Sequence, residues 1–83
     1  MNEWLDRARE SLAAEVGDPA ASLPLSEADI AEILDLARVA AHESGERPTA
    51  PVASYLVGLV RGRHPEADLT DLVRAVTGPS PEA

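Results

Sequence analysis

The sequence contains no cysteine, no phenylalanine and no lysine, and Trp4 and Tyr55 are the only aromatic residues among its 83. Without cysteine there are no disulfide bonds and no thiolate metal sites. A small domain without disulfides is more typical of the cytosol than of secreted proteins, so we expect a cytoplasmic protein. A chain this short also leaves little room for a deep active-site cleft. We therefore expect an interaction module rather than an enzyme.

Positive charge is scarce as well. Seven arginines stand against fifteen acidic residues, which gives a formal net charge of -8. The sequence has no row of basic residues that could bind phosphates and too few aromatic residues for nucleic-acid bases to stack on. Nucleic acid is therefore not expected as a partner. The longest apolar-rich run, Val52 to Val60, is about half the length that spans a bilayer. Because Glu3 and Asp6 interrupt any signal-peptide pattern, neither export nor membrane insertion is expected.

Apolar residues recur at helical spacing in four segments, which predicts an all-α, compact, single-domain four-helix arrangement. We expect the domain to cover residues 1–77 and residues 78–83 to form a frayed tail. Gly, Pro and capping residues set the predicted ends. The predicted helices run from near Asn2 to before Gly17, from the N-cap Ser26 to about Glu43, from an N-cap at Thr49 or Ala50 to Gly62, and from the N-cap Asp68 to before Gly78.

The same spacing predicts which side chains form the core. The third predicted helix is apolar nearly all round, which is typical of a central helix. Trp4 lies on the apolar stripe of the first helix, and we expect it to be buried and to hold that helix on the bundle. Ser54 and Gly58, four residues apart, form a small face that suits close helix packing. The other expected core residues are Ile30, Ile33, Leu34, Ala37, Ala40 and Ala41 in the second helix, and Leu69, Leu72, Val73 and Val76 in the fourth.

No motif predicts catalysis or a bound cofactor. Ser22 lies in a sequence similar to the Asp-Ser-Leu motif of acyl carrier proteins, but the aspartate is missing. Ser54 lacks the Gly-x-Ser-x-Gly turn and a nearby base. His42 and His64 do not have zinc-ligand spacing, and each follows the end region of a helix, where the dipole favours a positive charge. We therefore predict no catalytic, cofactor-binding or metal-ligating residue.

The segment that joins the second and third helices is the candidate binding surface. It contains His42, Arg47, Pro48 and Pro51, and the two prolines make it rigid. Arg47 just before a helix N-terminus is suited to hold an anion such as a phosphate. Pro51, however, removes one backbone donor from such a site. The other interpretation is an Arg47 that caps the helix or bridges carboxylates.

Three stretches together resemble a known family. They are Leu34 to His42, Arg47 to Pro51, and Tyr55 to Leu59. The combination is similar to a small actinobacterial domain of unknown function, which is encoded alone or as a C-terminal appendage to nucleotidyltransferases that resemble the molybdenum-cofactor guanylyltransferase. The likeness covers roughly Asn2 to Gly62. The glycine-rich nucleotide loop of the guanylyltransferase is not present in this sequence.

These observations favour a non-enzymatic helical module that binds a protein partner. The resemblance implies a role as an accessory to molybdenum-cofactor biosynthesis or insertion, with a molybdenum-cofactor enzyme or a maturation factor as the partner. One alternative is a small-ligand or nucleotide-binding helper that uses Arg47 and the start of the third helix. Another is a self-associating helical protein, a homo-oligomer without a ligand.

Overall fold

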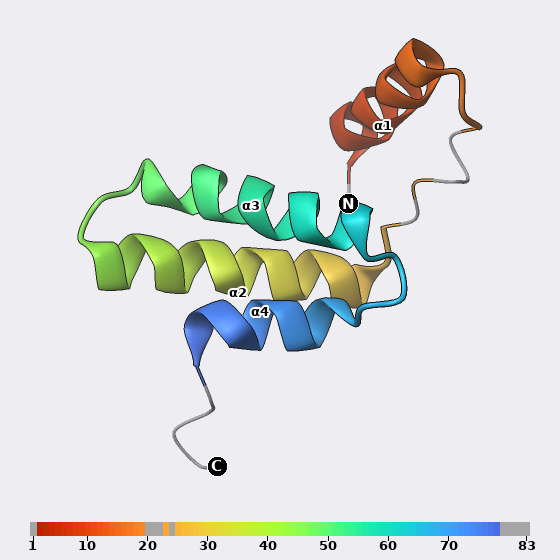
Figure 1. Ribbon diagram of the computed structural model, residues 1–83. Helices are drawn as coiled ribbons and strands as arrows, with labels where there is room; N and C mark the ends of the chain where they lie inside the picture. The colour runs from red at the N-terminus through yellow and green to blue at the C-terminus, as the bar shows by residue number, and fades with distance from the viewer. Residues whose placement is uncertain (1, 20–22, 24, 79–83) are drawn as a thin grey trace. The chain divides into compact units, whose positions relative to one another are not determined.

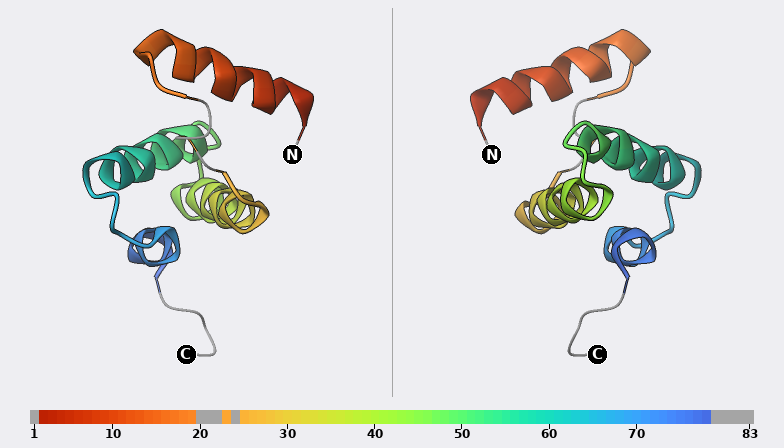
Figure 2. Two further views of the ribbon diagram at one scale, coloured as in Figure 1. Left: turned by 90° about the vertical axis from the view of Figure 1, so that its right-hand side faces the viewer. Right: turned by 90° about the vertical axis from the view of Figure 1, so that its left-hand side faces the viewer.

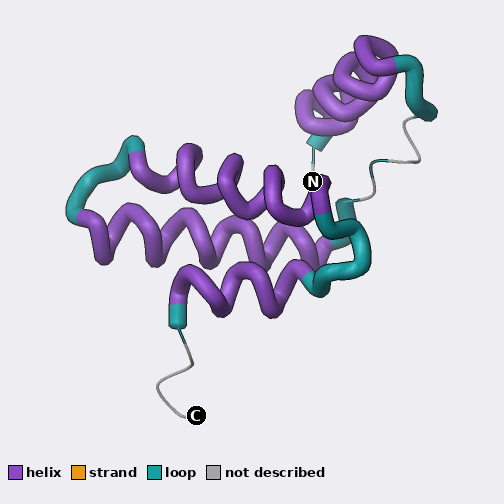
Figure 3. Tube along the Cα trace, viewed as in Figure 1, coloured by secondary structure: helices purple, strands orange, loops and turns teal. Residues whose placement is uncertain are grey.

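The computed structural model describes residues 2–19, 23 and 25–78 of the chain. This part consists of α1 (Glu3–Val16), α2 (Glu27–Ser44), α3 (Thr49–Arg63) and α4 (Leu69–Thr77), and the described residues contain no strand (Figures 1 and 3). The predicted all-α, four-helix class is confirmed. Contacts within the chain group it into two compact units, Met1–Ile30 and Ala31–Ala83. The predicted single domain over 1–77 stays a prediction, and residues 79–83 of the predicted tail lie outside the described residues.

The ends of α1 are fixed by local hydrogen bonds. Asn2 Oδ1 accepts from the backbone N–H of Leu5 at 2.8 Å, which satisfies one of the donors that a helix start leaves unpaired. Gly17 follows the helix with φ +77°, and the N–H groups of Gly17 and Asp18 donate to the carbonyls of Ala14 and Ala13. This is a Schellman motif, which requires a residue that tolerates positive φ.

The predicted caps of α2 and α4 are also confirmed. Ser26 Oγ accepts from the Asp29 N–H at 3.0 Å, and Asp29 Oδ2 accepts from the Ser26 N–H at 3.1 Å. This reciprocal pair is a capping box with aspartate in place of glutamate. At α4, Asp68 Oδ1 accepts from the Thr70 N–H at 2.8 Å.

The start of α3 differs from the prediction. The N-cap is Pro48, which makes no side-chain capping bond, and Thr49 is already the first helical residue. The Thr49 N–H donates to the Glu46 carbonyl, and the Ala50 N–H donates to the Arg47 carbonyl, both at 3.1 Å. The predicted cap at Thr49 or Ala50 was wrong because a turn at Glu46 to Pro48 supplies backbone acceptors instead of a side chain.

The unit Ala31–Ala83 is held by residues from three helices. In it α2 and α3 form an antiparallel hairpin, and α4 runs back along the unit in the direction opposite to α3 (Figures 1 and 2). Leu36, Val57 and Val73, one from each helix, form the core cluster and are at most 5% exposed. Leu69 and Leu72 pack against this cluster. A hydrogen bond of 3.2 Å from Thr70 Oγ1 to Glu32 Oε1 joins α4 to α2 at its edge.

Two core predictions on these helices were wrong. Leu36 is fully buried, whereas Leu34 is 54% exposed. The two leucines are two positions apart, so they lie on different sides of the helix, and the buried side includes Leu36 rather than Leu34. In α4 the predicted core residue Val76 is exposed, because it lies beyond Val73 at the end of a short helix.

Trp4 is 71% exposed. It belongs to the unit Met1–Ile30, so the expectation that it holds this helix on the other helices stays a prediction. Leu12 and Val16, from the same stripe, are exposed too, and the buried residue of α1 is the small Ala13. The spacing correctly predicted an amphipathic helix. An apolar stripe does not by itself say that another element covers it.

Replacing Leu36 by alanine should strongly destabilise the protein. Truncating a buried leucine typically costs about 2–5 kcal/mol, a large share of the stability of a small domain. The matched control is Leu34→Ala, which removes the same atoms from an exposed position and should change the free energy of unfolding by about 0.5 kcal/mol or less. Urea unfolding followed by circular dichroism measures both. Equal losses in the two variants would contradict the described core.

Candidate functional site

The predicted surface residues lie at the connection between α2 and α3. His42 is in the last turn of α2, Pro48 caps α3, and Pro51 is in its first turn. All of these side chains, and Arg47, are exposed. Between the helices, Gly45 has φ +75°, and the Ser44 hydroxyl accepts from the Glu46 N–H and donates to the Glu46 carbonyl. The structure thus brings the four candidates to one end of the helical hairpin and orders the turn between them.

The start of α3 is a poor anion site. The N–H groups of Thr49 and Ala50 already donate to backbone carbonyls, and Pro51 has no N–H. The first three helical positions therefore offer no free backbone donor of the kind that binds phosphates at other helix starts. Arg47 forms no hydrogen bond or ion pair with the residues that the structure describes. It does not bridge carboxylates there, and its guanidinium is the one group left of the proposed anion site.

A second surface, which the sequence did not single out, lies on α3. Five large apolar side chains of this helix are 37 to 68% exposed; they are Val52, Tyr55, Leu56, Leu59 and Val60. Steps of three, four and seven residues place them on one face, which we call the α3 outer face. Val57, by contrast, is buried in the core on the other side of the helix. The outer face carries no charge, and the nearest charges on the helix are Arg61 and Arg63 at its end.

The outer face explains why α3 is apolar nearly all round. The sequence predicted that such a helix is central, but within the described structure it buries Val57 and leaves the opposite face exposed. The sequence does contain one sign of this face: the polar strip of α3 is narrow, whereas an ordinary surface helix has a wide polar side. That signal cannot separate a helix surrounded by its own domain from one that a partner covers.

The predicted packing role of Gly58 stays a prediction. A Cβ atom added at Gly58 would meet no described atom within 4 Å. Ser54 is part-buried, and its hydroxyl donates to the Ala50 carbonyl at 3.0 Å, within the same helix. This bond uses the hydroxyl proton within the helix. Neither residue forms a site with the other.

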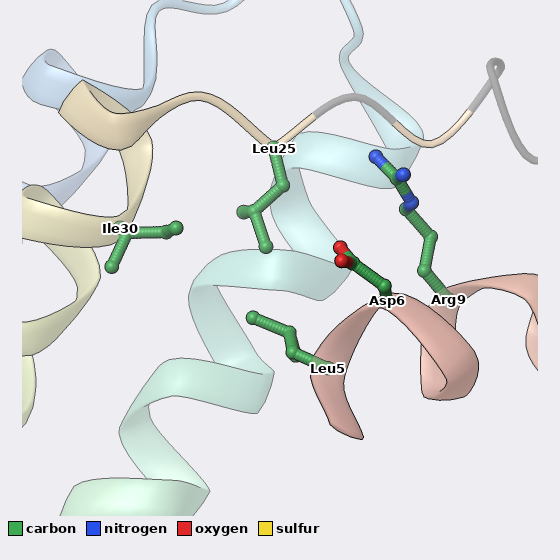
Figure 4. Close-up of a pocket in the computed structure, with 5 residues that line it drawn as sticks. All are labelled: Leu5, Asp6, Arg9, Leu25 and Ile30. Atoms are coloured by element: carbon green, nitrogen blue, oxygen red, sulfur yellow. The ribbon is translucent and has the colours of Figure 1, made fainter. Parts of the chain in front are cut away.

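A small pocket in the unit Met1–Ile30 is lined by Leu5, Asp6, Arg9, Leu25 and Ile30 (Figure 4). Its volume is about 20 Å³, enough for a water molecule and far below the roughly 300 Å³ of a typical ligand site. The buried Arg9 Nε has no hydrogen-bond partner among the described residues. The pocket cannot hold a nucleotide or an organic cofactor.

The remaining titratable groups are scattered. Among the residues that the structure describes, no three His, Asp or Glu side chains cluster as metal ligands would. His64 Nδ1 lies 3.6 Å from Glu66 Oε1, and both side chains are exposed. None of the helices in the described ranges is long and apolar enough to cross a membrane.

A family model described as a domain of unknown function, DUF6457, matches residues 1–81. No curated protein and no solved structure matches the chain significantly.

Two glycine replacements should change stability in opposite directions. Gly58→Ala adds a methyl group into open space in the middle of a helix and should raise the free energy of unfolding by up to about 1 kcal/mol. Gly45→Ala also meets no atom, but its φ of +75° disfavours a Cβ and should cost about 1–2 kcal/mol. Thermal unfolding of both variants measures this. A destabilising Gly58→Ala would support the predicted close packing at this position.

Proposed function

Because the chain belongs to the DUF6457 family of domains of unknown function, we propose a function from its surface: it is a non-catalytic helical module that binds a protein partner through the α3 outer face. The observation that carries this proposal is the exposure of Val52, Tyr55, Leu56, Leu59 and Val60 on one helix. Single exposed apolar residues are normal on any protein. A group of five on one face, along about two and a half turns of the helix, is typical of a surface that another protein covers.

The energetics favour this role. Burying apolar surface contributes about 25 cal/mol per Å². Val52, Tyr55 and Leu56 are each more than half exposed and have the most surface available for it. The residues belong to a helix whose other side is fixed by the core, so little backbone entropy is lost when a partner binds. Tyr55 adds a large, stiff side chain of the kind that is enriched at interface hot spots. The rigid turn at His42 to Pro51 adjoins the face and would extend the contact.

Several observations support a role without catalysis. The hydroxyl of Ser54 is bonded within its helix, His42 and His64 lie on exposed helix ends, and the pocket on the first unit is too small for a substrate. The alternative of an anion-binding or nucleotide-binding helper would depend on the Arg47 side chain alone. We place the interaction in the cytoplasm, in line with a cysteine-free chain.

In its finer form the proposal names the partner as a molybdenum-cofactor enzyme or a factor that matures one. The support for this form is the likeness of Leu34 to His42, Arg47 to Pro51 and Tyr55 to Leu59 to a domain found beside guanylyltransferase-like proteins. Deleting the gene should then lower the activity of molybdenum-dependent enzymes in the source organism, and the parent gene should restore it. Full activity of these enzymes after deletion would contradict a molybdenum-cofactor partner. It would not affect the broader proposal that the chain binds a protein.

Replacing Leu56 by glutamate should abolish partner binding without unfolding the protein. The change places a charge at the centre of the apolar face and keeps a good helix former, so an interface that buries Leu56 would hold an unpaired carboxylate. The control is Val76→Glu, which adds the same group at another exposed apolar position, in α4. Affinity capture from the source organism, compared by quantitative mass spectrometry, measures binding.

The parent and Val76→Glu should capture the same proteins, and Leu56→Glu should lose them. Circular dichroism of each variant separates a lost interface from a lost fold. The same set of proteins captured by all three folded variants would rule out the α3 outer face as the binding surface.

A further inference from the structure

We draw no further inference here: the strongest candidate, the exposed apolar stripe of α1 at Trp4, Leu12 and Val16, is a helix face for which nothing in the described part of the structure shows what covers it.

Discussion

The contact among Leu36, Val57 and Val73 is the interaction on which the unit Ala31–Ala83 depends. Each of α2, α3 and α4 contributes one fully or nearly fully buried side chain to it, and Leu69 and Leu72 pack around the cluster. Most of the stability of helices in proteins comes from tertiary packing, and an isolated helix as short as α4, with 9 residues, is marginal in water. With so few buried residues, each one carries a large part of the total. The N-caps Ser26 and Asp68 also stabilise this unit, because their side chains accept hydrogen bonds from backbone N–H groups in the first turns of α2 and α4.

The cluster also determines what α3 presents to its surroundings. Because Val57 is held in the core with Leu36 and Val73, the side of α3 that carries Val52 and Leu59 is turned away from the core. Leu56, one residue before Val57, lies about 100° around the helix from it. A helix with polar residues on that side would be an ordinary surface element. In this protein that side is apolar as well, and the core of the unit Ala31–Ala83 does not include it. The proposed binding function therefore follows from the same packing that forms the core.

Local features of the fold could be predicted from the sequence, and long-range ones could not. The helix ends at Gly17, Ser26, Asp68 and Gly78 depend on side chains or glycines within a few residues of each other, so the sequence contains the whole signal. The start of α3 was misplaced because its acceptors are backbone carbonyls of a preceding turn, which leave no side-chain signature.

The candidate site shows the same division. The segment around Arg47 was correctly placed between two helices, but only the structure shows that the backbone donors there are already used. Whether Leu34 or Leu36, and whether Trp4 or Ala13, is buried depends on what packs against each helix, and spacing alone leaves this open. For the same reason the α3 outer face could not be predicted from the sequence, because a wide apolar arc is equally consistent with a helix in the centre of a domain.

A double-mutant cycle between Val57 and Val73 tests the central claim most directly. It compares the free energies of unfolding of Val57→Ala, Val73→Ala and the double variant with that of the parent. If α3 and α4 meet through these two side chains, the losses should not add, and the coupling should be about 0.5 kcal/mol or more. Additive losses, with no coupling beyond the error of the measurement, would show that the two valines do not share a core and would contradict the arrangement described for α3.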